Sequence, residues 1–430
     1  MPLQPAPATR TGTERRIIPI SSGKGGVGKT TLAINYALSL SRHGRTVLVD
    51  LDTGTSSVRS GIDVPVQRDL YHFFKKGHTL GDCVTSLSEA LDPQGFYRGF
   101  GFIAAPKHFI EDLTNFTRAR REQLIDALNV LDARFIVLDL KAGLDANVIE
   151  FLPYSNSGIL VFTPHLGAAT LASSDIVKAI LFRKLRALFA PGSTVYGQLP
   201  GIVDSRFVNS LIDRVEDVYD SGMHNLDAFV SDLQHALGPH PVVKLVSNAV
   251  ETFVVHFVVN RFNGVKNSFD TAVRPFVSNL AENVGAGLTI LNLGWVVDSE
   301  RIHESNIRRL PALLSREPRP RSAAPDGGLA ALEKLAVLHL PGKPARAEKP
   351  KGEPAAKRCE AVAGAAYLDT QLDTLRHMFD DLKGTGYRDN FSYITSRTLH
   401  VMESRRTSDF GDTRIFKASE LRESIQARGR

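Results

Sequence analysis

Hydrophobic residues in the first 340 positions gather in short unbroken runs, and stretches with helical spacing separate these runs. Each run is rich in Val, Ile and Leu and lacks alternation with polar residues, which is typical of strands buried on both faces of a parallel sheet. The pattern therefore predicts a doubly wound α/β fold with a mostly parallel sheet and helices on both sides. The predicted strands are 16–21, 46–52, 134–140, 158–164, 254–260 and 288–296.

Three segments between the runs repeat apolar residues at a period near 3.6 and are predicted as amphipathic helices. The first, "TLAINYALSLSRHG", ends at Gly44, a residue type that commonly terminates helices. The others are "REQLIDALNVLDA" and "DIVKAILFRKLRALFA". The last one carries lysines and arginines beside its apolar face, and we interpret it as a core-packing helix with a solvated basic side rather than a membrane or partner surface.

Residues 191–253 interrupt the rhythm of strands with acidic helical stretches, so a helical insertion is predicted there. Farther along the chain the composition shifts toward Pro, Ala and Lys, which is typical of linkers. The predicted organisation is a flexible arm at 1–14, an α/β domain at 15–338 that contains the insertion, a Pro/Ala/Lys-rich linker at 339–360, and a small, partly disordered C-terminal interaction module at 361–430.

The composition excludes several classes of site. The two cysteines, Cys83 and Cys359, are far apart, so neither a disulfide framework nor a cysteine cluster for zinc or iron–sulfur is expected. The thirteen histidines show no spacing typical of metal ligands. A formal net charge of +6 and a pI near 9.2 allow nonspecific DNA as a partner without favouring it.

No segment has the apolar core of a signal peptide or the ~20 apolar residues that a membrane span needs, so a cytoplasmic location is expected. The segment "KASELRESIQARGR" at the end of the sequence has few large apolar residues. A stable amphipathic membrane anchor is therefore not expected there.

The segment "GKGGVGKT", Gly23 to Thr30, lies between the first predicted strand and the first predicted helix, the setting in which GxxxxGK[ST] binds phosphates. Glycines let the backbone approach phosphate oxygens, while backbone N–H groups and the helix N-terminus attract negative charge. Lys29 is expected to bridge the β- and γ-phosphates, and Thr30 to ligate Mg²⁺. The predicted nucleotide-binding residues of this loop are Gly23, Lys24, Gly25, Gly26, Val27, Gly28, Lys29, Thr30 and Thr31.

Acidic residues follow two predicted strands, at the edge of the sheet where the glycine loop is expected. Asp139 closes the "FIVLD" strand and is predicted to hold the Mg²⁺ hydration shell. Asp52 follows the second strand and is predicted to orient the metal or the attacking water, whereas Asp50 is expected to brace its loop by hydrogen bonds. The predicted metal site therefore consists of Thr30, Asp52 and Asp139.

The segment "SGKGGVGKTT" resembles the deviant Walker A motif of the MinD/ParA ATPases, in which the first lysine is the signature. Further similar segments follow in family order, namely "VLVDLD", "FIVLDLKAG", "GILVFTP", "FVVNRFN" and "LNLGWVVDSERIHES". The resemblance covers about residues 15–338 and implies a P-loop NTPase fold with ATP and Mg²⁺ as cofactors. The most similar branch is the MinD-like group that includes the flagellar number regulators, whose chains have a comparable helical insertion.

The resemblance implies that two subunits enclose two ATP molecules and that Lys24 reaches the nucleotide of the partner subunit. Lys24 would then stabilise the negative charge on the transferring phosphoryl group, as an arginine finger does elsewhere. The predicted catalytic residues are Lys24, Lys29 and Asp52. The resemblance also implies adenine recognition by Asn260, with Arg261 beside it in the nucleotide site, while an Asn at a strand end is also a common turn former.

Three positions depart from expectation. Ser57 stands where the family usually carries an Asn, and Lys141 replaces a small residue or proline after the "FIVLD" strand. A bulky cation near the γ-phosphate would slow or alter hydrolysis more than binding. Pro19 lies inside the first predicted strand, where it removes a backbone donor.

Together these features predict a slow, Mg²⁺-dependent ATPase that switches between a monomer and an ATP-bound homodimer, and so positions or counts a cellular structure. A second hypothesis is an ATP-bound scaffold with little or no hydrolysis, motivated by Lys141 and Ser57. A third is a DNA-partition ATPase of the ParA type, which the positive charge allows. An activating protein partner is expected, and the sequence does not identify it.

Overall fold

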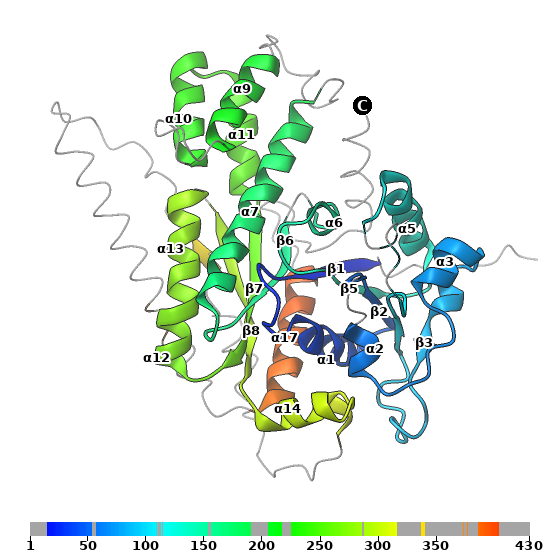
Figure 1. Ribbon diagram of the computed structural model, residues 1–430. Helices are drawn as coiled ribbons and strands as arrows, with labels where there is room; N and C mark the ends of the chain where they lie inside the picture. The colour runs from blue at the N-terminus through cyan, green and yellow to red at the C-terminus, as the bar shows by residue number, and fades with distance from the viewer. Residues whose placement is uncertain are drawn as a thin grey trace, which may run out of the picture.

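The computed structural model describes residues 15–53, 57–108, 110, 113, 115–153, 156–190, 205–216, 225–285, 288–315, 337–339, 373, 376 and 386–403. Within these ranges, nine strands form one sheet in the order β3-β4-β2-β5-β1-β6-β7-β8-β9. Helices lie on both sides of this sheet (Figure 1). The predicted doubly wound α/β fold is confirmed. The predicted arm at 1–14 and all but the first residue of the predicted linker at 339–360 lie outside the described ranges.

The strands of the sheet are β1 (Arg16–Ser21), β2 (Thr46–Asp50), β3 (Thr85–Ser86), β4 (Phe100–Ile103), β5 (Phe135–Asp139), β6 (Asn156–Phe162), β7 (Val254–Phe262), β8 (Thr289–Val297) and β9 (Val337–His339). The short edge strands β3 and β9 pair antiparallel with their neighbours, and the inner strands pair parallel. The six predicted strands are present with small shifts at their ends. Strands β3, β4 and β9 were not predicted, because runs of two to four residues are too short to show a pattern. The segment "FGFI" of β4 becomes a strand by pairing with β2.

Alternate residues of the central strands enter two separate apolar cores, which explains the unbroken hydrophobic runs. In β1, Ile17 packs into one core, whereas Ile18 and Ile20 pack into the other. In β2, Val49 and Leu48 are divided in the same way. Every side chain of β2, and every one of β1 except half-buried Arg16, is therefore withdrawn from water.

The first core lies under the long helix α7, whose apolar face is fully buried at Ile180 and Leu185. On its outer side, Arg186 forms an ion pair with Asp213. The elements that contribute to this core or adjoin it are α3 (Leu70–Lys76), η1 (Gly81–Cys83), α5 (Arg118–Val130), α6 (Ala146–Ile149), α7 (Gly167–Leu188), α9 (Ser205–Glu216), α10 (Leu226–Leu237), α11 (Pro241–Glu251), α12 (Val265–Ser268), η2 (Phe269–Val273) and α13 (Arg274–Asn283).

Helices α9, α10 and α11 follow α7 and precede β7, so the described part of 191–253 is helical as predicted. Figure 1 shows them grouped at the top of the molecule beside α7. The exact bounds of the insertion stay a prediction, because 191–204 and 217–224 lie outside the described ranges.

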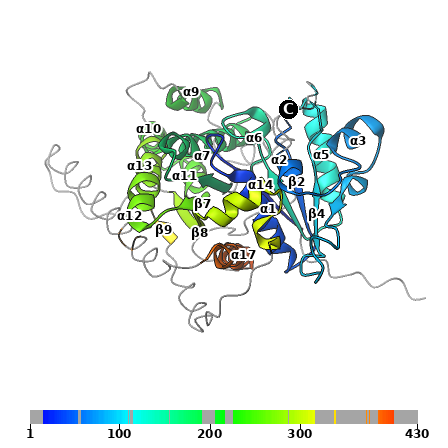
Figure 2. The same ribbon diagram turned by 60° about the horizontal axis from the view of Figure 1, so that its bottom comes forward.

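The second core lies on the opposite face of the sheet, where α17 packs beside α1 (Figure 2). Phe391 and Ile394 of α17 are buried in it, and the Phe391 carbonyl accepts a hydrogen bond from Ser39 of α1. The elements of this face are α1 (Lys29–Ser41), α2 (Ser57–Gly61), α14 (Glu300–Ile307), η3 (Ala312–Leu314) and α17 (Tyr387–Glu403).

The position of α17 differs from the sequence-based expectation for 361–430. Residues 387–403 were not predicted as a helix, and they do not stand apart from the α/β domain but cover its sheet. A shape match explains this packing: Gly294 of β8 has no side chain, and a Cβ added there would lie 2.9 Å from Ile394. The remaining residues of 361–430, except 373, 376 and 386, lie outside the described ranges, so the division into domains stays a prediction.

Pro19 lies in β1 without disturbing the sheet. β1 pairs with β5 along most of its length, but with β6 only at Ile20 and Ser21. Pro19 precedes this short pairing and lies against Gly158, which has a φ of +64° and at which an added Cβ would lie 2.8 Å from the Pro19 carbonyl oxygen. The missing backbone donor therefore falls where the ladder is already interrupted.

No helix in the described ranges combines the length and hydropathy that crossing a membrane requires.

Candidate functional site

The glycine loop connects β1 to α1 and owes its shape to close packing from two directions. A Cβ added to Gly23 would lie 2.5 Å from the backbone carbon of Ala172 in α7, so α7 leaves room for no side chain there. Gly28 has a φ of +80°, and its added Cβ would lie 2.4 Å from the amide nitrogen of Asn260. Glycine at both positions is therefore a steric requirement of the loop.

Lys29 and Thr30 converge on one carboxylate at the carboxyl edge of the sheet. The Lys29 ammonium lies 2.5 Å from Oδ1 of Asp139, and the Thr30 hydroxyl donates to Oδ2 at 2.7 Å. Lys29 is only 7% exposed and Asp139 is fully buried. Because a buried charge is costly unless it is paired, Lys29 and Asp139 hold each other in place beside the N-terminus of α1.

Asp50 ends β2 directly beside Asp139, to which it is paired in register. Its carboxylate accepts hydrogen bonds from the backbone N–H groups of Asp52 and Val58, which confirms the prediction that Asp50 braces this loop. Burial, together with the negative charge of Asp139, raises the pKa of Asp50 to about 8. Asp50 is thus a structural acid behind the site, and half-buried Asp52 lies at the open edge.

The residues present fit a magnesium nucleotide. The hydroxyls of Thr30 and Ser57 lie 3.1 Å apart, next to the Asp139 carboxylate, and oxygen ligands of this kind suit Mg²⁺. In the described part of the chain, no group of three or more His, Cys, Asp or Glu is arranged to hold a metal without help. Thr30, Asp139 and nearby Asp52 would hold the ion.

Lys24 differs sharply from Lys29. It is exposed, and so are the neighbouring Gly25 and Gly26. Its charge acts on Asp175 of α7, whose pKa is raised by partial burial while Lys178 and Lys24 oppose that rise. The Lys24 side chain is thus accessible to another molecule. Its role toward a second subunit stays a prediction.

Asn260 and Arg261 lie at the end of β7, beside the glycine loop. The Asn260 amide donates to the Val27 carbonyl at 2.7 Å, so it supports the loop from behind. Arg261 has a φ of +55° and pairs with Asp298 at 3.4 Å, and His165 lies 3.2 Å from the same carboxylate. The structure brings Asn260 to the loop. Adenine recognition by Asn260 and nucleotide binding by Arg261 stay predictions.

Two hydrogen bonds of the glycine loop could not be predicted from the sequence. Ser173 of α7 accepts a hydrogen bond from the Gly23 N–H at 3.3 Å, and the Gly143 N–H donates to the Ser22 carbonyl at 2.8 Å. Both partners are more than a hundred residues away from the loop. No local pattern marks a serine or glycine for such a contact, so only the fold reveals it.

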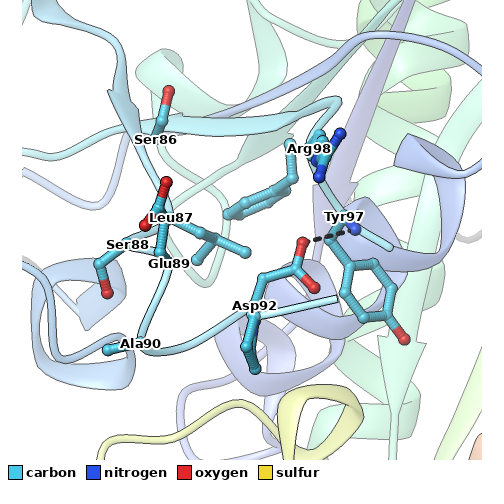
Figure 3. A pocket seen from close by; sticks show the side chains of 10 residues that line it. Ser86, Leu87, Ser88, Glu89, Ala90, Asp92, Tyr97 and Arg98 are labelled. Atoms are coloured by element: carbon cyan, nitrogen blue, oxygen red, sulfur yellow. Dashed lines mark hydrogen bonds between the residues drawn. The ribbon is translucent and has the colours of Figure 1, made fainter. Parts of the chain in front are cut away.

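A surface hollow of about 690 Å³ lies elsewhere, between Ser86 and Phe100. Figure 3 shows Asp92 within it, with its carboxylate turned to the Tyr97 backbone. The same carboxylate accepts from the Phe96 N–H, so it holds the turn together. Because this segment precedes β4 while the glycine loop follows β1, the hollow lies at the opposite edge of the parallel sheet and is separate from the candidate site.

A comparison with protein-family models matches residues 18–308 to the CobQ/CobB/MinD/ParA nucleotide binding domain, which is more than half of the chain. The chain belongs to this family. The matched region begins inside β1 and includes the glycine loop and the strands β2 to β8. Helix α17 lies beyond it. The flagellar branch suggested by the sequence stays a prediction.

Individual relatives of the MinD/ParA domain cover shorter regions. The septum site-determining protein MinD of Escherichia coli K12 is 29% identical over 174 residues, 40% of this chain and 60% of that protein. The chloroplastic MinD homologue of Arabidopsis thaliana is 33% identical over 176 residues, 40% of this chain and 51% of that protein. The chain thus spans between half and three fifths of these curated relatives.

Solved structures are similar over a larger share of the chain. MinD of Pyrococcus horikoshii, complexed with Mg-ADP, has 15% sequence identity and a TM-score of 0.41, and the match covers 70% of this chain and 88% of that one. A plasmid partition protein of Borrelia burgdorferi bound to AMPPNP has 15% identity and a TM-score of 0.36, with 71% and 93% covered.

Proposed function

We propose that this protein is a Mg²⁺-dependent ATPase whose ATP-bound form is a homodimer and whose hydrolysis returns it to monomers. The observation that carries the proposal is the convergence of Lys29 and Thr30 on buried Asp139 at the N-terminus of α1. A lysine, a hydroxyl and a carboxylate in this arrangement are the parts that a P-loop uses to bind a Mg²⁺ nucleotide.

The chemistry of the site follows from the residues in place. Backbone N–H groups of the glycine loop and the α1 N-terminus bind the phosphates, and Lys29 exchanges its bond to Asp139 for one to phosphate. Bound Mg²⁺ supplies charge neutralisation of the phosphates. Thr30 and Asp139 would hold this ion, and Asp52 would orient it or the attacking water.

The dimer is supported by exposed apolar residues at the edge of the sheet where the glycine loop lies. Large apolar side chains are exposed at Leu144, Leu166 and Leu171, in the segments that follow β5 and β6 at the edge where the loop lies. Exposed apolar groups of this size near a polar site suit a surface that is covered by another molecule. A second copy would cover them and would bring its own Lys24 to the nucleotide.

Light scattering with size-exclusion chromatography tests the proposal on the full-length protein. ATP and Mg²⁺ should convert a monomer into a dimer, and ADP should not. Lys29→Ala should abolish both nucleotide binding and dimerisation, whereas Lys24→Ala should keep nucleotide binding and lose the dimer. Lys244→Ala, which changes an exposed lysine of α11 far from the loop, serves as the matched control. A wild-type protein that stays monomeric at saturating ATP and Mg²⁺ would refute the dimer.

The second candidate is a scaffold that dimerises on ATP without turnover, and Lys141 and Ser57 favour it. Ser57 bonds to Thr30 where the family usually has an Asn, and Lys141 brings a cation to the same edge. Phosphate release distinguishes the two: turnover that depends on Lys24 supports the ATPase, and ATP-driven dimers without phosphate release support the scaffold.

The cellular role proposed is spatial positioning or number control of a structure in a cytoplasmic setting, through an activating protein partner. The relatives named for septum-site determination and plasmid partition support this class of role. Flagellar number control and DNA partition are its specific forms. ATP-dependent, salt-sensitive binding to nonspecific DNA would favour partition, and its absence would favour the others.

A further inference from the structure

Lys141 lies on the segment that connects β5 to α6, two residues after Asp139. Because one residue of extended chain spans at most about 3.6 Å, its Cα lies within about 7 Å of the Asp139 Cα. Asp139 is the carboxylate that Lys29 and Thr30 contact. Lys141 therefore borders the same edge of the sheet as the two residues that would hold phosphate and metal.

The backbone around Lys141 is fixed to the glycine loop. The Gly143 N–H donates to the Ser22 carbonyl at 2.8 Å, immediately before Gly23. Gly143 adopts a φ of +93°, which lets the segment turn back toward the loop. This hydrogen bond keeps the segment that carries Lys141 beside the glycine loop.

The Lys141 ammonium itself is held weakly. It lies 3.6 Å from Oδ2 of Asp145, and the two side chains are 42% and 28% exposed. Ion pairs of this length and exposure contribute little. The other oxygen of Asp145, Oδ1, accepts from the Asn147 N–H at 2.7 Å and caps α6. A multiply charged anion beside the loop would therefore compete successfully with Asp145 for Lys141.

We propose that Lys141 distinguishes ATP from ADP within one subunit, by leaving Asp145 and pairing with the γ-phosphate of the nucleotide bound to the same chain. This inference rests on the proposed nucleotide function. It gives the site a cation in addition to Lys29 and to the Lys24 of a partner subunit. Asp145 then acts as a positioning residue that holds Lys141 aside until a triphosphate arrives.

Calorimetric titration of the full-length protein with AMPPNP and with ADP, both in Mg²⁺, tests the inference. Lys141→Ala should weaken AMPPNP binding by roughly tenfold, the scale of one charge-assisted hydrogen bond, and leave ADP binding within about twofold. Lys141→Arg should restore most of the loss, because it keeps the charge. Repeating the titrations in a Lys24→Ala background removes any contribution from dimerisation.

Asp145→Asn provides the opposite change. Asn caps a helix as well as Asp does, so α6 keeps its cap while Lys141 loses its charged partner. AMPPNP should then bind about two- to fivefold more tightly, again with ADP unchanged. Because this variant gains affinity, damage to the fold cannot produce the expected result.

These titrations test the role of Lys141 separately from nucleotide binding itself. A Lys141→Ala loss that is equal for AMPPNP and ADP, or no loss at all, would overturn the inference while wild-type binding of AMPPNP leaves the proposed function intact. A wild-type protein that binds neither nucleotide would overturn both. A selective loss for AMPPNP with rescue by Lys141→Arg supports the assignment.

Discussion

Helix α1 joins two regions of the molecule that differ in how they are built. Its first turn forms the nucleotide edge, where Lys29 and Thr30 meet Asp139 in a polar, charged cluster. Its last turns form the α17 face, where Ser39 donates to Phe391 across 352 positions of the sequence. The first region is specified by a short motif, and the second by a helix from the far end of the chain.

The comparison shows that one end of α1 carries residues of the candidate site, whereas the other end contributes to the stability of the fold. At the nucleotide edge, the charged groups of Lys29 and Asp139 in the candidate site are buried. Their burial costs free energy, which the rest of the fold must offset. On the α17 face, apolar side chains leave water and supply that free energy. Changes at the two ends of α1 should therefore affect different measurements.

The largest effect is expected on the α17 face. Phe391 is 1% exposed, and Phe391→Ala should lower the free energy of unfolding by about 3–5 kcal/mol, because it removes contacts and leaves a cavity. Chemical denaturation measures the loss, and ATP affinity of the folded fraction should stay unchanged. Ser392→Ala, at an exposed position of the same helix, should change stability by less than about 0.5 kcal/mol. Equal effects of both variants would mean that α17 does not pack on α1.

A smaller stability effect with a larger functional one is expected at the nucleotide edge. Gly28→Ala should cost about 1–3 kcal/mol, since alanine is strained at a φ of +80° and its Cβ would meet Asn260. Nucleotide binding should fall at least about tenfold because the loop must shift to relieve the contact. Gly25→Ala serves as the control when the free energy of unfolding is measured in the absence of nucleotide, because an added Cβ at Gly25 meets no atom within 4 Å. A similar loss of stability in both variants would contradict the steric account.

The most gradual effect concerns pH, at no more than about 1.4 kcal/mol per pH unit for one group, and it has opposite signs in the two regions. Burial, with a contribution from Arg397 of α17, lowers the pKa of His256 to about 3. Native His256 stays neutral while the unfolded chain takes up a proton below about pH 6.5, so stability falls as the pH drops from there toward about 3. The raised pKa of Asp50 acts in the other direction, because stability is lost as the pH rises from 3.8 to about 8.

Denaturation midpoints of wild type and His256→Gln between pH 7 and pH 4 measure the His256 contribution. The wild type should lose up to about 1.4 kcal/mol per pH unit more than the variant over this range. Parallel profiles for the two proteins would show that His256 does not titrate as its burial implies.

The fold could be predicted from the sequence for those strands whose residues are apolar on both faces of the sheet. Val49 and Leu48 of β2 lie in cores on opposite faces of the sheet, and both cores exclude water. An unbroken apolar run indicates a strand of this kind. The strand β4 escaped prediction because four residues with a glycine among them carry no such signal, and pairing with β2 makes them a strand. The same holds for α17, whose helical pattern was not recognised among polar residues.

The candidate site divides in the same way. Lys29, Thr30 and Asp139 could be predicted because a motif and the end of a strand mark them, and the structure brings them together. The contacts of Asn260 with Val27, and of Gly143 with Ser22, depend on which strands and loops adjoin the glycine loop. Their residue types are common at turns, so the sequence offered no reason to expect these particular bonds.

The sequence by itself determined the parallel α/β architecture and the phosphate-binding loop, because both rest on short-range patterns that physical chemistry restricts strongly: apolar runs for strands dry on both sides, and glycines for a backbone that must approach an anion. Only the tertiary structure decided that α17 covers α1, that Asn260 supports the glycine loop at Val27, and that Gly143 ties the segment of Lys141 to Ser22. Those features depend on contacts between distant or differently folded segments, and a contact of that kind leaves no local trace in the chain.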